Sequence, residues 1–239
     1  MKTYTSFQEL DALGEGLAKK YTGNTHRWNS SCFDIEGFIT DFLKLPILYE
    51  AFAEDDPSKI GFLSDGITPL IVYRAGKKTP IVFPKDTIVI ESFLQRSDES
   101  GRRRFTLAHE AAHFILNRHV PMQTACFHNE YDHAFHYSGE ELARMFSLNE
   151  TLTNRLGAAV LMPPFLVCRA LKKYNNGQPI VYYTEGVFAP DTKIRLQSMS
   201  DALGVSYSAL INRLRELRLL ECRPIEEYID HALFPEKSI

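Results

Sequence analysis

Two histidines and a glutamate in one short segment have the residue types and the spacing of a metal site. The segment is RRRFTLAHEAAHFILNRH (102–119), where His109 and His113 are four positions apart and Glu110 directly follows the first. Side chains at i and i+4 of a helix share one face, so both imidazoles can bind one Zn²⁺ at about 2.0–2.1 Å. Glu110 lies one step round the helix, within reach of a water on the metal. The pattern predicts a zinc hydrolase site with Glu110 as the proton-accepting base.

The alternative is a buried helix whose histidines are merely hydrogen-bonded. Two histidines and a glutamate on an otherwise apolar helix are costly to bury without a metal or a charged partner, which favours the zinc site. A catalytic zinc usually has a third protein ligand and leaves its fourth position to water. Helical periodicity does not choose among the downstream candidates, which are Glu140, Glu141, Glu150, His128, His133 and His136.

The sequence around this segment predicts an α+β fold. Residues 34–45 have the apolar spacing of a helix, which Pro46 ends. Residues 59–96 are short β-rich runs separated by turn residues, typical of a small, mostly antiparallel sheet. The alanines of the histidine segment repeat at helical spacing and form one apolar stripe, through which we expect that helix to pack closely on the sheet. The stripe comprises Ala108, Ala111, Ala112 and Ile115.

A second helical stretch spans residues 140–162 and ends at Pro163 and Pro164. Beyond it the pattern predicts a short helix, a β-hairpin at 179–190 and two helices from about 193 to 220. We therefore expect one domain over 1–190 that holds the site. A helical C-terminal extension with a helix-turn-helix-like pattern follows over 191–239.

Composition excludes several classes of function. The chain has 239 residues, 44% hydrophobic and 24% charged, with a formal net charge of −3. This charge gives no global electrostatic case for binding nucleic acid or membranes. The four cysteines form no CxxC pair, which argues against a disulfide framework or a thiolate zinc site. The first residues lack the apolar core of a signal peptide, and no apolar run reaches the roughly 18 residues of a membrane span, so we expect a cytoplasmic protein.

Two motifs resemble those of the ImmA/IrrE metallopeptidases. RRRFTLAHEAAHFIL is similar to the family's R-x-RFTLAHELGHxLL, and ETLTNRLGAAVLMP (150–163) is similar to its second hallmark, E-x-x-A-N-x-F-A-A-x-L-L-M-P. The resemblance implies a zincin-like zinc endopeptidase domain over 1–190. It also implies that Glu150 is the third zinc ligand and that Asn154 hydrogen-bonds a ligand to fix its orientation. Glu140 and Glu141 remain fallback ligands. The second motif departs from the family's where Thr153, Leu156 and Gly157 replace Ala, Phe and Ala.

The spacing between the two motifs is a further departure. His113 and Glu150 are 37 residues apart, longer than usual for the family, and the extra material is the segment around ACFHNEYDHAFHYSG. One interpretation is a surface lid. Another is that Cys126, His128, His133 or His136 caps the open zinc position. A third is that one of these four, or Tyr131 or Tyr137, donates a hydrogen bond to the oxyanion. These alternatives stay open.

The resemblance implies a substrate as well as a reaction. Known family members cleave helix-turn-helix repressors and so switch on genes of mobile elements or stress responses, and a toxin–antitoxin setting is a related expectation. The C-terminal stretch SMSDALGVSYSALINRL itself has a helix-turn-helix pattern, but nearby acidic residues offset its arginines, so we expect no direct DNA binding. The rival hypotheses are a regulatory module that holds DNA or protein and uses zinc structurally, and a zinc hydrolase acting on a non-peptide substrate.

Overall fold

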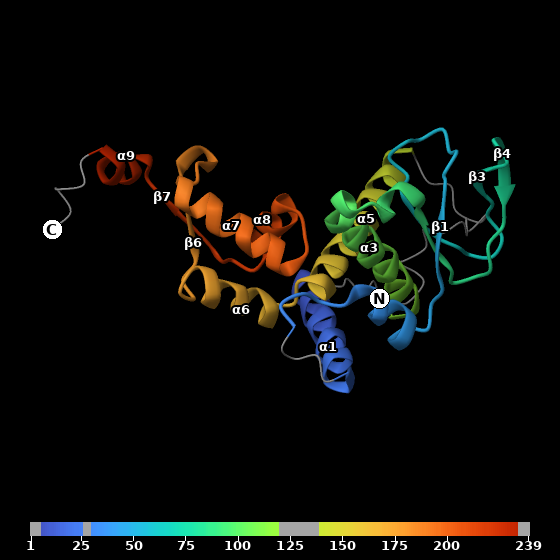
Figure 1. Ribbon diagram of the computed structural model, residues 1–239, viewed down its shortest axis with the longest axis horizontal. Helices are drawn as coiled ribbons and strands as arrows, with labels where there is room; N and C mark the ends of the chain where they lie inside the picture. Colours follow the sequence, from blue (N-terminus) through green and yellow to red (C-terminus); the bar gives the residue numbers. More distant parts are fainter. Residues whose placement is uncertain (1–5, 26–29, 120–138, 234–239) are drawn as a thin grey trace. The chain divides into compact units, whose positions relative to one another are not determined.

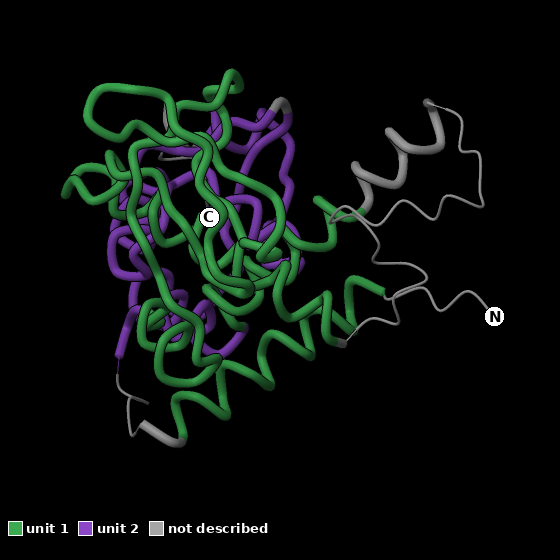
Figure 2. The backbone as a smooth tube through the Cα atoms, turned by 90° about the vertical axis from the view of Figure 1, so that its right-hand side faces the viewer, with its two compact units in different colours: residues 1–29, 33–163 green, residues 30–32, 164–239 purple. Residues whose placement is uncertain are grey.

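The computed structural model describes residues 6–25, 30–119 and 139–233 (Figure 1). Within these ranges, the side chains of 24–25, 119, 139–148, 185 and 231–233 are not described. The chain divides into two compact units, coloured separately in Figure 2. The first comprises residues 1–29 and 33–163, and the second comprises 30–32 and 164–239. Each is described by itself.

The first unit combines helices with two small β-elements, as the α+β prediction requires. Its helices are α1 (Phe7–Thr25), the short α2 (Ile35–Gly37) with the π-helical turn η1 (Phe38–Phe42), the 3-10 turns η2 (Ser92–Gln95) and η3 (Ser97–Glu99), α3 (Ser100–His119) and α5 (Gly139–Leu161). Its strands are β1 (Ile47–Glu50), β2 (Gly61–Leu63), β3 (Leu70–Arg74), β4 (Lys77–Ile81) and β5 (Ile88–Glu91).

The sheet that packs on α3 is mixed. Its strand order is β1-β5-β2, with β2 antiparallel and β1 parallel to β5. The expected antiparallel pairing therefore holds for β2–β5 and for the β3–β4 hairpin, but not for β1. A parallel partner requires a long connection, and the chain between β1 and β5 supplies it by forming β2 and the hairpin on the way.

Helix α3 buries its apolar stripe between the sheet and α5. Strand β5 is buried along Ile88–Ile90, and α3 contacts both β5 and β2. Ala108, Ala111 and Ala112 are at most 1% exposed, so small side chains line the face of α3 that the sequence marked for close packing.

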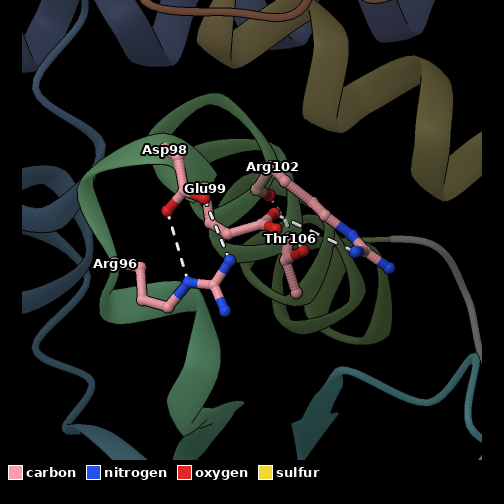
Figure 3. Close-up of polar contacts among 5 residues, drawn as sticks. All are labelled: Arg96, Asp98, Glu99, Arg102 and Thr106. Atoms are coloured by element: carbon pink, nitrogen blue, oxygen red, sulfur yellow. Dashed lines mark hydrogen bonds and ion pairs between the residues drawn. The ribbon is translucent and has the colours of Figure 1, made fainter.

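The charged loop before α3 pairs its own charges. Figure 3 shows Arg96 on Asp98 and Arg102 beside Glu99. The first ion pair spans 2.9 Å and the second 3.9 Å. The hydroxyl of Thr106 donates back to the carbonyl of Arg102 over 3.0 Å (Figure 3). Cations in the first turn oppose the helix dipole, and these acidic neighbours offset part of that cost.

The next two arginines attach the same end of α3 to the α2 region. Arg103 Nε lies 3.4 Å from a Glu36 carboxylate oxygen, and the Arg104 guanidinium donates to the carbonyl of Phe33. The arginine run therefore anchors the start of the helix that carries both histidines.

The second unit contains α6 (Pro164–Tyr174), β6 (Ile180–Tyr183), η4 (Thr184–Gly186), α7 (Pro190–Leu203), α8 (Tyr207–Glu216), β7 (Leu220–Arg223) and α9 (Ile225–Leu233). The expected hairpin at 179–190 is wrong, because β6 pairs in parallel with β7, and Tyr183 and Val187 form only an isolated bridge. The first compact unit ends at Pro163. The domain boundary expected at residue 190 stays a prediction.

Helices α7 and α8 form a helix–turn–helix. Gly204 ends α7 in the left-handed conformation at φ 66°, and the Ser206 hydroxyl caps α8 by accepting from the Ala209 N–H. Within the described residues, no helix is long and apolar enough to cross a membrane.

Helix α5 lies against α1 through a glycine. A Cβ built on Gly14 would stand 2.6 Å from the Cβ of Ala159. It would also lie 3.0 Å from the Ala159 carbonyl carbon, which is part of the backbone of α5. An ion pair between Arg155 and Asp11 joins the same two helices. The position of α5 therefore depends on the absence of a side chain at residue 14.

We expect Gly14→Ala to destabilise the protein by about 1–3 kcal/mol, because the added methyl meets helix backbone that cannot move aside locally. Gly16→Ala is the matched control. It lies on the same helix with nothing within 4 Å of its built Cβ. That change should stabilise by about 0.5–1 kcal/mol through helix propensity. Urea unfolding of both variants measures the difference, and equal effects of the two substitutions would contradict the packing role of Gly14.

Candidate metal centre

The structure brings together His109 and His113 from α3 and Glu150 from α5. The Nε2 atoms of the two histidines lie 3.0 Å apart. Glu150 Oε2 lies 3.3 Å from His109 Nε2, and its Oε1 lies 3.6 Å from His113 Nε2. These three side chains form a group able to hold a metal ion.

The donor spacing fits a tetrahedral ion. Ligand atoms at about 2.0–2.1 Å from zinc, separated by tetrahedral angles, lie roughly 3.3–3.4 Å from one another. The two Nε2 atoms lie 3.0 Å apart, and the two carboxylate oxygens of Glu150 lie 3.3 and 3.6 Å from one Nε2 each, which is close to that value. Two imidazoles and a carboxylate are also a donor set that zinc accepts in catalytic sites. The residues present therefore fit the metal that the spacing of the histidines predicts.

Asn154 of α5 lies against the ring of the first histidine. Its Oδ1 lies 3.0 Å from His109 Nδ1, so an amide oxygen there accepts the Nδ1 proton and leaves Nε2 facing the other ligands. Burial by itself lowers the pKa of His109. The Glu150 hydrogen bond and the charges of Glu110 and Glu150 outweigh burial and raise that pKa above its ordinary value. This balance shows a negative local potential, which favours a bound cation.

The close approach of α5 to α3 allows Glu150 to reach the histidines. A Cβ built on Gly157 would lie 3.1 Å from the Ala108 carbonyl oxygen and 3.3 Å from the His109 nitrogen. Residue 157 is thus in tight contact with α3 beside the first ligand. A glycine here permits an interhelical distance that a larger residue would increase.

Glu110 points away from the exposed side of α3, toward strand β2. The residue is 6% exposed, and a Cβ built on Gly61 would stand 2.5 Å from Glu110 Oε1. Burial raises the pKa of Glu110 to about 7, while His109 and a hydrogen bond from the Leu63 backbone N–H act in the opposite direction. Such a carboxylate is poised to take a proton near neutral pH.

Strand β2 is a part of the site that sequence reasoning missed. Gly61 leaves room for the Glu110 side chain, and Leu63 supplies a backbone donor to it. The available signal was the glycine inside a short β run, which often marks the close approach of another group.

Several residues considered from the sequence are not placed. Cys126, His128, Tyr131, His133, His136 and Tyr137 lie outside the described residues. The side chains of Glu140 and Glu141, in the first turn of α5, also lie outside the described part of the structure. The assignments of these residues, and the roles given to Glu110, Glu150 and Asn154, stay predictions.

A protein-family model matches this region. The model is Peptidase_M78, the IrrE N-terminal-like domain, and it matches residues 92–215. The chain belongs to this family. The match includes all of α3 and α5 and continues into α8. It identifies the chain as a member of a metallopeptidase family, as the two motifs indicated. A comparison with curated proteins finds no match.

The raised pKa of Glu110 predicts a pH-dependent stability of the metal-free protein. A carboxyl group with an ordinary pKa of 4.5 and a folded-state pKa of about 7 favours folding fully below pH 4.5. That contribution is lost as the pH rises through 7, because the buried group must then ionise. Glu110→Gln removes the ionisation, so the variant should be more stable than the wild type at about pH 8 and similar to it near pH 4.

Urea unfolding in the presence of a chelator tests this at both pH values. The wild-type protein without substitution serves as the reference at each pH, so titration of other groups cancels. A stability difference between the two proteins that does not change with pH would contradict the buried, protonated state of Glu110.

Proposed function

We propose that this protein is a zinc-dependent endopeptidase that cleaves a helix-turn-helix transcriptional repressor in the cytoplasm and thereby switches on genes of a mobile element, toxin–antitoxin system or stress response. The observation that carries the proposal is the convergence of His109, His113 and Glu150 in a member of a peptidase family, with a buried glutamate next to the first ligand. The zincin-like arrangement, a small sheet packed on the histidine helix, is part of the same proposal.

Three residues would hold the metal ion, and a fourth would act as the base. A zinc ion held by His109, His113 and Glu150 would supply Lewis-acid polarisation of a substrate carbonyl and would acidify a bound water. Glu110 accepts the proton of the attacking water on a carboxylate oxygen and passes it to the leaving amine as the peptide bond breaks. The Leu63 N–H and the space at Gly61 hold that carboxylate in place.

The repressor as substrate rests on the resemblance of the two motifs to the ImmA/IrrE metallopeptidases. A DNA-binding role for the second unit is less well supported. Arg213 of α8 is fully buried, and its guanidinium lies 3.1 Å from Glu216. An arginine in that position cannot contact a phosphate without leaving the core. We therefore propose that the helix–turn–helix of this chain is structural and that the partner binds DNA.

Metal removal should abolish cleavage. The purified protein is expected to contain one zinc per chain, to lose peptidase activity on chelation and to recover it with Zn²⁺. His113→Ala should bind zinc weakly under the same conditions, because one of three protein ligands is gone. Elemental analysis and an activity assay measure both outcomes. Full activity of a protein shown to be free of metal would exclude the proposed reaction.

Glu110→Gln should retain zinc and lose cleavage by a factor on the order of 10²–10⁴, since the amide cannot accept the proton. The same variant is a substrate trap. Proteins that it retains from cells can be identified by mass spectrometry and then treated with the wild-type enzyme.

Cleavage of a retained DNA-binding repressor by the wild type, with none by Glu110→Gln, is the expected result. Cleavage of other proteins only would overturn the substrate but not the enzyme. Binding of the same partners by the wild type without any cleavage would support the alternative, a zinc-containing regulatory module without peptidase activity.

A further inference from the structure

Two consecutive residues of α5 face the two histidines of α3. Asn154 Oδ1 lies 3.0 Å from His109 Nδ1, and Thr153 Oγ1 lies 3.4 Å from His113 Nδ1. The second contact is at the long end of hydrogen-bonding distance. Thr153 is 1% exposed, so its hydroxyl lies in the interface between the helices rather than in water.

The orientation of His113 explains why a hydrogen-bond acceptor is favourable beside its Nδ1 atom. Its Nε2 faces His109 Nε2 at 3.0 Å and Glu150 Oε1 at 3.6 Å. A neutral imidazole that keeps the Nε2 lone pair for a metal carries its proton on Nδ1. That proton points toward α5, where the Thr153 hydroxyl oxygen can accept it. Asn154 does the same for His109.

Thr153 is also one of the positions at which the ETLTNRLGAAVLMP stretch of this chain departs from the family motif that it resembles, E-x-x-A-N-x-F-A-A-x-L-L-M-P, which has alanine there. The alanine side chain is a methyl group, which packs at a buried contact between helices and brings no polar atom into it. Threonine brings a hydroxyl into a buried site, which is favourable only where the hydroxyl has hydrogen-bonding partners. The substitution therefore introduces a polar group at the place where a ligand ring presents its N–H.

We propose that Thr153 is a positioning residue of the metal centre: its hydroxyl accepts the Nδ1–H of His113, fixes the ring and its tautomer, and so strengthens metal binding. The proposal rests on the proposed zinc site. Partners of this kind typically change metal affinity by roughly 10–100-fold when removed.

The test separates the hydroxyl of Thr153 from its methyl group. Thr153→Val keeps the shape and loses the hydroxyl, and Thr153→Ser keeps the hydroxyl and loses the methyl. We expect the dissociation constant for Zn²⁺, measured on the full chain by competition with a chromophoric chelator, to rise about tenfold or more in Thr153→Val. In Thr153→Ser it should stay within about threefold of the wild type. Stability should show the opposite order, because the buried methyl contributes to packing.

Two further variants complete the design. Thr153→Ala against Thr153→Ser is a second pair that differs only in the hydroxyl, should the valine variant fold poorly. Thr22→Val is the matched control. Thr22 is a buried helical threonine of the same unit, and its hydroxyl donates to the Ala18 carbonyl over 2.8 Å. The Thr22→Val substitution should leave zinc affinity unchanged.

The outcomes are distinct. Equal zinc affinity of the wild type and Thr153→Val would overturn the role of Thr153 while the zinc site stands. If zinc affinity fell in parallel with stability in Thr153→Val, Thr153→Ser and Thr22→Val, Thr153 would be only a packing residue. That result would also overturn the proposed positioning role. A wild-type chain that binds no zinc would refute the metal centre itself, and with it the function proposed above.

Discussion

The close packing of α5 against α3 is the constraint on which the metal centre depends. Glu150, Thr153, Asn154 and Gly157 are spaced i, i+3, i+4 and i+7, so they share one face of α5. Along that face lie the carboxylate ligand, two side chains that meet the histidine rings, and the glycine in tight contact with Ala108. A shift of α5 along or away from α3 would displace all of them together. The contact of α5 with α1 through Gly14 supports the same helix from another side.

This arrangement gathers possible metal donors from two helices. The two Nε2 atoms and a carboxylate converge, and the charges of Glu110 and Glu150 contribute to the potential that raises the pKa of His109. Binding of a metal ion by these donors would stabilise the fold as well as supply chemistry.

The sequence could predict what depends on local periodicity. Helical spacing places His109 and His113 on one face, and the alanine stripe of α3 is buried as its pattern indicated. Contacts between segments that are distant in the sequence were harder to predict. Nothing local distinguishes Glu150 from Glu140 or Glu141, so choosing it required the resemblance of a second motif. The parallel β1–β5 pair and the β6–β7 pair in place of a hairpin depend on long-range register, which short β runs do not encode. The same limit hid Gly61 and Leu63, since only folding brings β2 to Glu110.

The two glutamates of the site have opposite environments, which suit the different roles proposed for them. Glu150, the proposed ligand from α5, has a side chain that is 55% exposed. Glu110 is packed under β2, where burial raises its pKa to about 7, as suits a group that takes up and returns a proton. Their positions follow from the helices. Glu110 is one residue past His109, about 100° round α3 and therefore on the side of the sheet, whereas Glu150 comes from α5 on the side of the rings. Helix α3, packed between the sheet and α5, thus directs the proposed ligands and the proposed base to different sides.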